Sequence, residues 1–362
     1  MPIREKSFRI GCGRYVQEEG AILTCGEEIR RLGHAPLILG GKTALSLTRT
    51  TLEESVKNAC DAYEIITYTG TCNHEMAKEY AALAREKGYD VIVGVGGGVL
   101  MDFAKLCACY AELPVINIPT SSATCAAYTA MSVCYTPEGR TLSGKHFQKE
   151  VDCVLVDTAI LARQPIRLLL AGIFDALAKF IEIKHRYHAD DPDSPLGLDW
   201  AYIMAQYSYQ LLTEKIRPCI EDMQKGLITK AMEEVFFTAI AATGAISGIA
   251  RGSNQCALAH EFYENTRTFY PVSSRPYLHG EIVGVGLLLQ NQFNGELAEN
   301  EGLLELMHAH HMPCTISQLT VEKTPAAMEN YFEEMKNCSS IDPACPHDLE
   351  KLRSALTYLW NL

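Results

Sequence analysis

The feature that most restricts the fold is a buried strand that leads into a glycine cluster and then a helix. This segment, residues 91–105, reads VIVGVGGGVLMDFAK. Glycines let a backbone approach its ligand closely, and free N–H groups at a helix start attract an anion. The segment therefore predicts a strand–turn–helix unit that binds a phosphate group through its main chain, because no Lys or Arg precedes Lys105.

The glycine pattern differs from two known phosphate-binding motifs. The cluster comprises Gly94, Gly96, Gly97 and Gly98, and the position three residues after Gly96 is Val99. This matches neither the dinucleotide fingerprint nor a Walker A loop. A tight strand-to-helix turn without a ligand is the alternative, but four glycines in five positions after a strand favour phosphate binding.

The first part of the chain alternates between short apolar segments and amphipathic ones. This alternation predicts βαβ units and a parallel sheet whose ligands bind at the carboxyl ends of the strands. A helix is expected at 72–88. Strands are expected at 35–40, 63–70, 90–96, 113–119 and 153–157.

The second part of the chain has the apolar spacing of helices from 164–186 onward. Pro165 suits a first helical turn. The apolar run at 235–250 is too short and too rich in Gly, Ser and Thr to span a bilayer, so it predicts a buried helix. We therefore predict an α/β nucleotide-binding domain with a parallel sheet at 1–160 and an all-α domain at 161–362.

Composition restricts the partners and the compartment. The net charge of −12 disfavours a nucleic-acid surface, and residues 1–16 lack the apolar core of a signal peptide. Fourteen cysteines lie without framework spacing, which is typical of reduced thiols. We expect a cytoplasmic protein without a nucleic-acid or membrane partner.

Two further segments carry candidate site residues. Small hydroxylated residues follow the strand expected at 113–119, and the segment 117–140 either contacts a ligand or forms a plain Ser/Thr-rich loop. In the helical half, Asp175, His260 and His279 have the chemistry of a Zn²⁺ or Fe²⁺ site, although a buried or capping histidine is the commoner explanation. The denser cluster MHAHHMP, residues 307–313, predicts a helix terminus rather than a metal site.

Several motifs, in this order, resemble the iron-containing (group III) alcohol dehydrogenases, in the glycerol-dehydrogenase-like branch. They run from about residue 90 to residue 285 and read GVGGGVLMDFAK, IPTSSATCAAYTAMSVCYTPEG, LLAGIFDALAKF, ALAH and YLHGEIVGVG. The resemblance implies the two-domain architecture shared with dehydroquinate synthase, NAD(P) at the glycine loop and one divalent metal, Zn²⁺ or Fe²⁺. It also implies a homo-oligomer.

The resemblance assigns roles residue by residue. Asp175, His260 and His279 correspond to the metal ligands. The cofactor-contacting positions correspond to Gly97, Gly98, Asp102, Thr120, Thr129, Met131 and Tyr135.

Three departures from the glycerol dehydrogenase pattern bear on the substrate. Val99 and Cys125 replace a usual Lys and Asp, and Tyr263 and Glu264 occupy the places where a second histidine normally follows His260. A neutral thiol at Cys125 is a poor partner for polyol hydroxyls. Together with the aliphatic residue at Val99, the TCAA variant resembles the hydroxycarboxylate dehydrogenase subgroup, whose members reduce 2-oxo acids.

Lys179 supports an anionic substrate independently. It follows Asp175 by four residues, so on one helix both side chains share a face. There it would receive a substrate carboxylate or phosphate. The alternative is a solvent-facing lysine paired with Asp175 or Glu182.

The end of the second expected strand bears on the choice of cofactor. Members that prefer NAD usually have Asp at the position of Gly41, where it binds the ribose hydroxyls. Its absence here permits NADPH, whose 2′-phosphate Lys42 would neutralise. The sequence therefore predicts NAD(P)(H), with NADPH favoured.

We expect a metal-dependent NAD(P)H oxidoreductase that interconverts a small 2-oxo acid and its 2-hydroxy acid by direct hydride transfer. Asp175, His260, His279 and Lys179 are the expected catalytic residues, and Cys125 and Lys179 the expected substrate contacts. Glycerol or glycerol-phosphate dehydrogenase is the alternative. A dehydroquinate-synthase-like lyase and an inactive nucleotide binder are further alternatives.

Overall fold

The computed structural model describes residues 10–136, 141–187, 191, 194–250 and 255–362. Residues 1–9 and the end of the hydroxyl-rich segment, 137–140, lie outside this description. Contacts divide the chain into two compact units. The α/β unit comprises Arg9–Pro165 and Glu214–Gly248, and the helical unit comprises Ile166–Thr213 and Ile249–Leu362.

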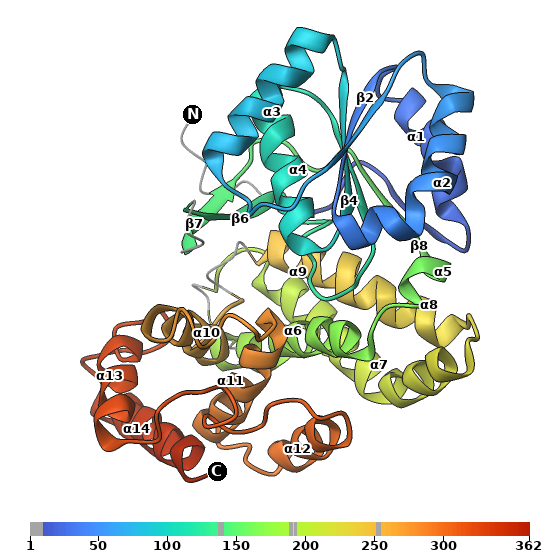
Figure 1. The fold of residues 1–362 in the computed structure, drawn as a ribbon. Helices are drawn as coiled ribbons and strands as arrows, with labels where there is room; N and C mark the ends of the chain where they lie inside the picture. The colour runs from blue at the N-terminus through green and yellow to red at the C-terminus, as the bar shows by residue number, and fades with distance from the viewer. Residues whose placement is uncertain (1–9, 137–140, 188–190, 192–193, 251–254) are drawn as a thin grey trace. The chain divides into compact units, whose positions relative to one another are not determined.

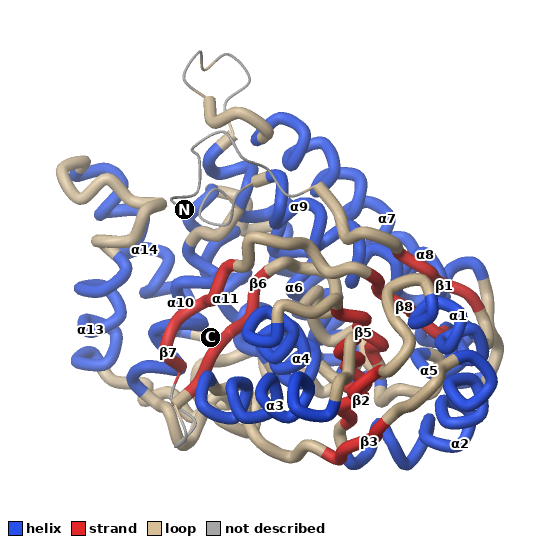
Figure 2. The backbone as a smooth tube through the Cα atoms, turned by 90° about the horizontal axis from the view of Figure 1, so that it is seen from above, coloured by secondary structure: helices blue, strands red, loops and turns tan. Residues whose placement is uncertain are grey.

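The α/β unit contains a six-stranded sheet in the order β1-β8-β5-β4-β2-β3, in which every pair is parallel. Figure 2 shows these strands side by side, with β6 and β7 as a separate antiparallel pair. The parallel sheet predicted from the sequence is thus confirmed. The strands are β1 (Tyr15–Glu18), β2 (Pro36–Gly40), β3 (Glu64–Thr67), β4 (Val91–Gly96), β5 (Val115–Pro119), β6 (Met131–Tyr135), β7 (Thr141–His146) and β8 (Cys153–Asp157).

Helices cover both faces of this sheet, with α1 and α2 on one face and α3 and α4 on the other (Figure 1). Buried strands covered on two faces read as continuous apolar runs, which explains why β2, β4, β5 and β8 are predictable. The helical elements are η1 (Ala21–Thr24), α1 (Cys25–Arg30), α2 (Lys42–Ala59), α3 (His74–Lys87), α4 (Gly98–Ala111), α5 (Thr158–Leu161), α8 (Lys230–Phe237), η2 (Thr238–Ala242) and α9 (Thr243–Ile249).

Three strands were not predicted. β1 is a short, half-buried edge strand. β6 lies within the segment 117–140, where the sequence predicts only a ligand-contacting or plain loop, and β7 follows directly after that segment. The predicted strand at 63–70 ends earlier, at Thr67. Strands without a continuous or alternating apolar pattern give no periodic signal, which accounts for these differences.

The predicted apolar run at 235–250 lies within the helical stretch Lys230–Ile249, formed by α8, the π-helix η2 and α9. Among the described residues, this stretch alone is long and apolar enough to cross a membrane, but 61% of its apolar window is buried. It therefore packs as a core helix, as predicted. Most of it groups with the α/β unit, which the sequence did not indicate.

The helical unit is built around α6, which packs against α11, while α11 also packs against α10 and α14. Pro165 immediately precedes α6 instead of lying in its first turn. The helices are α6 (Ile166–Arg186), α7 (Leu198–Lys225, which continues into the α/β unit), α10 (Leu258–Phe269), α11 (His279–Asn294), α12 (Glu299–Ala309), α13 (Pro325–Met335) and α14 (Pro346–Asn361).

Candidate metal centre and cofactor loop

One face of α6 carries three charged side chains at helical spacing. Asp175, Lys179 and Glu182 lie at positions i, i+4 and i+7, and their exposed fractions are 4%, 4% and 0%. Charged groups this deeply buried are rare unless they are paired or bind an ion. This face of α6 is therefore a candidate site.

Two histidines are brought to this face by the starts of neighbouring helices. His260 lies in the first turn of α10, and His279 is the first residue of α11. A Cβ atom on Gly280 would lie 1.7 Å from the carbonyl oxygen of Ala171, so only glycine lets α11 approach α6 this closely. The residue after His279 thus has a packing role that positions the histidine.

The three predicted metal ligands converge. The Nε2 atoms of His260 and His279 lie 3.4 and 3.5 Å from Asp175 Oδ1, and the three ligand atoms lie within 4.8 Å of one another. Asp175 Oδ1 is buried and, among the described residues, makes no regular hydrogen bond. A buried acceptor facing two imidazoles fits a divalent cation, because two His nitrogens and one carboxylate oxygen suit Zn²⁺ or Fe²⁺.

Glu182 orients His260 from the other side of the imidazole ring. Its Oε2 lies 2.5 Å from His260 Nδ1, and its Oε1 accepts hydrogen bonds from the backbone N–H groups of Ala257 and His260 at 2.8 and 3.0 Å. A carboxylate that holds Nδ1–H fixes the tautomer and directs Nε2 toward the metal. The sequence indicates Glu182 only as a partner of Lys179, and nothing in it predicts the contact with His260, which lies 78 residues away.

The charges in the pocket are strongly coupled. Burial raises the pKa of Asp175, but Lys179, His260 and His279 outweigh burial and hold that pKa well below its usual value. Burial lowers the pKa of His260, but Cys256 and Glu182 raise it well above its usual value. Without a metal, the carboxylates therefore stay ionised and His260 carries a proton.

Lys179 lies in the pocket and does not face solvent. Its Nζ is 3.2 Å from Asp175 Oδ1 and 3.4 Å from His260 Nε2, and 5% of the side chain is exposed. The predicted pairing with Asp175 is present, and so is the predicted position beside the metal ligands. The solvent-facing alternative is therefore wrong, and contact with a substrate anion stays a prediction.

Tyr263 lies where a second histidine was expected from the family pattern. Its ring packs edge-on against His279, with centroids 4.3 Å apart, and the guanidinium of Arg267 lies 5.3 Å from the Tyr263 centroid. This aromatic contact covers one side of His279. Burial raises the pKa of Tyr263, so the phenol stays protonated at neutral pH.

In the α/β unit, the predicted cofactor residues lie at the carboxyl edge of the sheet. The N–H of Gly41 donates to the carbonyl of Val95 at 3.0 Å, and the N–H of Thr120 donates to the carbonyl of Gly96 at 2.9 Å. β2 and β4 are neighbours in the sheet, and the chain continues from β2 to β3 on one side and from β4 to β5 on the other side. The strand order therefore reverses between β2 and β4, which makes this position a topological switch point. The contacts bring together Gly41, Lys42, Gly97, Gly98 and Thr120.

The four glycines of the loop have two different roles. Cβ atoms on Gly94 and Gly96 would lie 2.6 and 2.7 Å from side chains of α4, so these glycines allow α4 to pack against β4. A Cβ atom on Gly97 would have no neighbour closer than 3.6 Å, and no side chain caps the first turn of α4. A Cβ atom on Gly98 would lie 2.8 Å from Thr124 Oγ1. The open backbone at Gly97, directly before α4, fits a phosphate group.

Of the remaining predicted cofactor residues, Asp102 lies on α4 and the others lie between β5 and the end of β6. The carbonyl groups of Thr129 and Met131 accept hydrogen bonds from Lys105, and the carboxylate of Asp102 pairs with the same lysine at 2.9 Å. The carboxylate of Asp102 is thus bound to Lys105 and to the backbone N–H of Val133. The backbone N–H of Tyr135 donates to the carbonyl of Cys72, and the carbonyl of Cys125 accepts from the N–H of Tyr128.

Two other features lie apart from these sites. The predicted helix terminus in the histidine cluster is confirmed, because α12 ends at Ala309.

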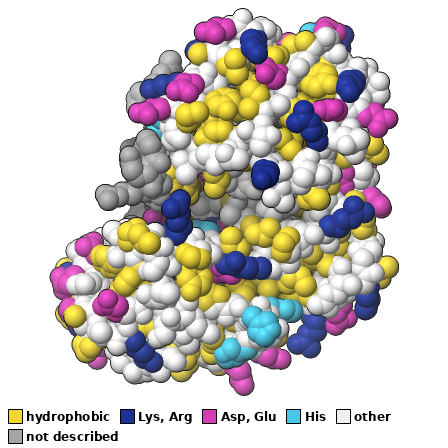
Figure 3. Space-filling view, viewed as in Figure 1, with side chains coloured by type: hydrophobic (Ala, Val, Ile, Leu, Met, Phe, Trp, Pro, Cys, Tyr) yellow, Lys and Arg dark blue, Asp and Glu magenta, His cyan; other side chains and the backbone are white. Residues whose placement is uncertain are grey.

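On the face drawn in Figure 3, basic side chains of the described residues lie singly among acidic and apolar ones.

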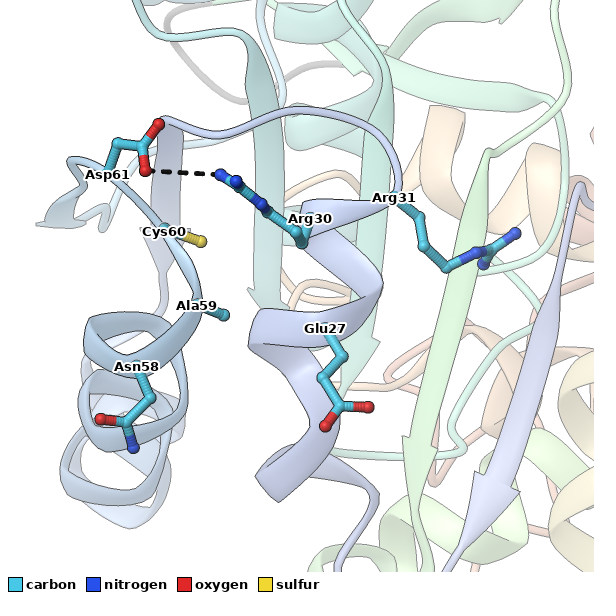
Figure 4. A pocket seen from close by; sticks show the side chains of 7 residues that line it. All are labelled: Glu27, Arg30, Arg31, Asn58, Ala59, Cys60 and Asp61. Atoms are coloured by element: carbon cyan, nitrogen blue, oxygen red, sulfur yellow. Dashed lines mark hydrogen bonds and ion pairs between the residues drawn. The ribbon is translucent and has the colours of Figure 1, made fainter.

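An open cavity of about 600 Å³ lies between the end of α1 and the end of α2 (Figure 4). Its two arginines are paired: Arg30 with Asp61 at 3.4 Å, and Arg31 with Glu28 at 2.6 Å. The cavity therefore offers little uncompensated positive charge for an anion. These helix ends precede β2 and β3, so the cavity lies at the opposite sheet edge from the glycine loop.

Comparisons with known proteins agree with this geometry. The family model described as "Iron-containing alcohol dehydrogenase" matches residues 12–158. A glycerol dehydrogenase of Pseudomonas putida is 32% identical over 89% of this chain and 87% of its own length. Hydroxycarboxylate dehydrogenase A of Escherichia coli K12 is 31% identical over 87% of this chain and 82% of its own length.

A solved structure shows the same fold. The probable glycerol dehydrogenase of Sinorhizobium meliloti 1021 aligns with a TM-score of 0.83 and 22% identity, covering 98% of this chain and 99% of that one. The chain therefore belongs to the iron-containing alcohol dehydrogenase family, in its glycerol-dehydrogenase-like branch, and is a metal-dependent, NAD-linked alcohol dehydrogenase.

Proposed function

We propose that the protein interconverts a small polyol and its ketone, with glycerol and dihydroxyacetone as the first pair to test. The glycerol dehydrogenases among its relatives support this substrate class more than the 2-oxo acids expected from the sequence. The convergence of Asp175, His260 and His279 carries the proposal.

Residues of this chain would bind the metal ion and the cofactor that carry out the reaction. When bound, the divalent ion would act as a Lewis acid on the substrate oxygen, and NAD(P) would accept or donate the hydride. Asp175, His260 and His279 would hold the ion, and Glu182 keeps the Nε2 of His260 directed toward it. Gly97 and Gly98 would receive the pyrophosphate through backbone N–H groups.

Steady-state assays with Zn²⁺- or Fe²⁺-loaded protein test the proposal. NAD⁺ reduction with glycerol, or NADH oxidation with dihydroxyacetone, is expected, and Asp175→Ala should abolish both. Turnover on neither compound, with cofactor and metal both bound, would exclude the polyol proposal.

A second candidate function, the reduction of small 2-oxo acids, is favoured by Lys179. With a divalent cation bound, Asp175 and Glu182 balance its charge, and the ammonium of Lys179 leaves the pocket one positive charge in excess. A fixed cation beside the metal favours a substrate that carries a carboxylate. The thiol of Cys125 lacks the charge of the Asp found at this position in glycerol dehydrogenases.

Lys179→Met separates the two candidate functions. If the substrate is a 2-oxo acid, its KM should rise about tenfold or more with the loss of the charged contact, while a neutral hydroxyketone is much less affected. Lys184→Met is the matched control, because Lys184 lies on the same helix but pairs with Glu296. Equal changes for acids and hydroxyketones would contradict a carboxylate-binding role.

The preference for NADPH also stays a proposal. Lys42 is exposed at the first position of α2, directly after Gly41. We expect Lys42→Ala to raise the KM for NADPH about threefold to tenfold and to leave the KM for NADH unchanged, because the surface charge meets only the 2′-phosphate. Equal effects on both cofactors would contradict this role.

A further inference from the structure

We propose that Lys105 is a positioning residue that holds segment 126–131 in the conformation that receives the nicotinamide half of the cofactor. The proposal rests on the proposed function, because it takes the segment after β5 as part of the cofactor site. Lys105 is the first basic residue after the glycine loop, yet it is only 3% exposed.

The ammonium group of Lys105 is bound entirely by groups of the α/β unit. Its Nζ donates to the carbonyl oxygens of Ala126 at 2.6 Å, of Thr129 at 2.9 Å and of Met131, and it pairs with Asp102 Oδ1 at 2.9 Å. An ammonium has three donors, so these four acceptors saturate it. Lys105 therefore cannot serve the pyrophosphate.

Neighbouring contacts fix Ala127 within this segment and the two residues directly after it. Asp102 Oδ2 accepts from the backbone N–H of Val133 at 3.0 Å, and the carbonyl of Asp102 accepts from Ser132 Oγ at 2.8 Å. On β5, Asn117 Nδ2 donates to the carbonyl of Ala127 at 3.0 Å. The segment is thus attached to α4 and β5 through inward-turned carbonyl groups.

Burial makes this arrangement specific. A buried ammonium without partners costs free energy, and so do buried carbonyl groups without donors. Lys105 and the carbonyl groups of segment 126–131 satisfy one another only when the segment has this conformation. Because α4 begins at Gly98, the helix that presents its N-terminus to the pyrophosphate also sets the position of segment 126–131. Lys105 therefore couples the two halves of the cofactor site.

A comparison of whole and truncated cofactor tests the proposal. We would measure the Kd of NADH and of ADP-ribose, which lacks the nicotinamide, for the wild type and for Lys105→Met. The NADH Kd should rise about tenfold, while that of ADP-ribose stays within about twofold, because only the nicotinamide meets the displaced segment. Lys87→Met is the matched control, since Lys87 pairs with Glu64 on the surface of the same unit, and both Kd values should stay unchanged.

The outcomes are distinguishable. Equal weakening of NADH and ADP-ribose, or weakening of neither, would overturn the role of Lys105. A wild type that binds ADP-ribose but not NADH would instead contradict the proposed function. If Lys105→Met does not fold, Ser132→Ala removes one attachment and keeps the lysine, and the ratio of the two Kd values should then shift about twofold to threefold in the same direction. An unchanged ratio in Ser132→Ala would also overturn the proposal.

Discussion

The metal pocket and the glycine loop bind charged ligands by opposite means. The metal pocket gathers buried charged side chains from three helices, whereas the loop offers main-chain N–H groups and no basic side chain before Lys105. A side-chain site depends on single atoms, so one substitution removes a ligand. A main-chain site depends on available space, so it is damaged by addition of atoms and not by their removal.

The largest effect should follow loss of a metal ligand. Asp175→Ala removes the only carboxylate among the three predicted ligands, and we expect metal affinity to fall on the order of a thousandfold. Isothermal titration with Zn²⁺ measures this loss. The NADH Kd should stay unchanged, because the glycine loop belongs to the other unit. Parallel loss of NADH binding would contradict the independence of the two sites.

Removal of the group that orients His260 should have a smaller effect. Glu182→Gln keeps the shape but weakens the hold on Nδ1–H, and metal affinity should fall about tenfold to a hundredfold. Competition with a chelator measures the affinity. Glu264→Gln is the matched control, because Glu264 is an exposed carboxylate on the same helix as His260. Similar losses in both variants would argue against an orienting role.

The glycine loop should respond to added atoms according to position. Gly97→Ala adds a Cβ that meets nothing closer than 3.6 Å, so stability should hold while NADH binding weakens about tenfold. Gly96→Ala places a Cβ 2.7 Å from Leu100, and we expect it to cost about 1–3 kcal/mol of stability. Thermal unfolding measures the change in stability, and NADH titration measures the change in cofactor binding, for both variants. Destabilisation by Gly97→Ala with normal binding would contradict the phosphate role.

Metal binding should also depend on pH. Because the pKa of His260 is raised in the metal-free pocket, His260 is protonated at neutral pH and a metal must displace that proton. Metal affinity should therefore rise with pH, by about tenfold per unit, until the pH passes the raised pKa. Titrations at several pH values measure the slope. NADH binding at the glycine loop, which has no titratable group before Asp102, should show no matching slope.

Much of the fold and of the main-chain site could be predicted from the sequence alone. Buried parallel strands are continuous apolar runs, and the glycine loop is contiguous in the chain, so both leave a local signal at residues 91–105. The resemblance to the family's motifs also identified the three predicted metal ligands in the sequence. The short strand β1 and the β6–β7 hairpin left no periodic signal and could not be predicted.

Only the tertiary structure decided how the side chains are used. Asp175, Glu182, His260 and His279 lie on three helices, and their convergence depends on the close approach of α6 and α11 at Gly280. The same holds for Lys105, whose carbonyl partners lie more than twenty residues further along the chain. A sequence determines local periodicity and motif order. Contacts between distant residues follow from helix packing, which no local pattern records.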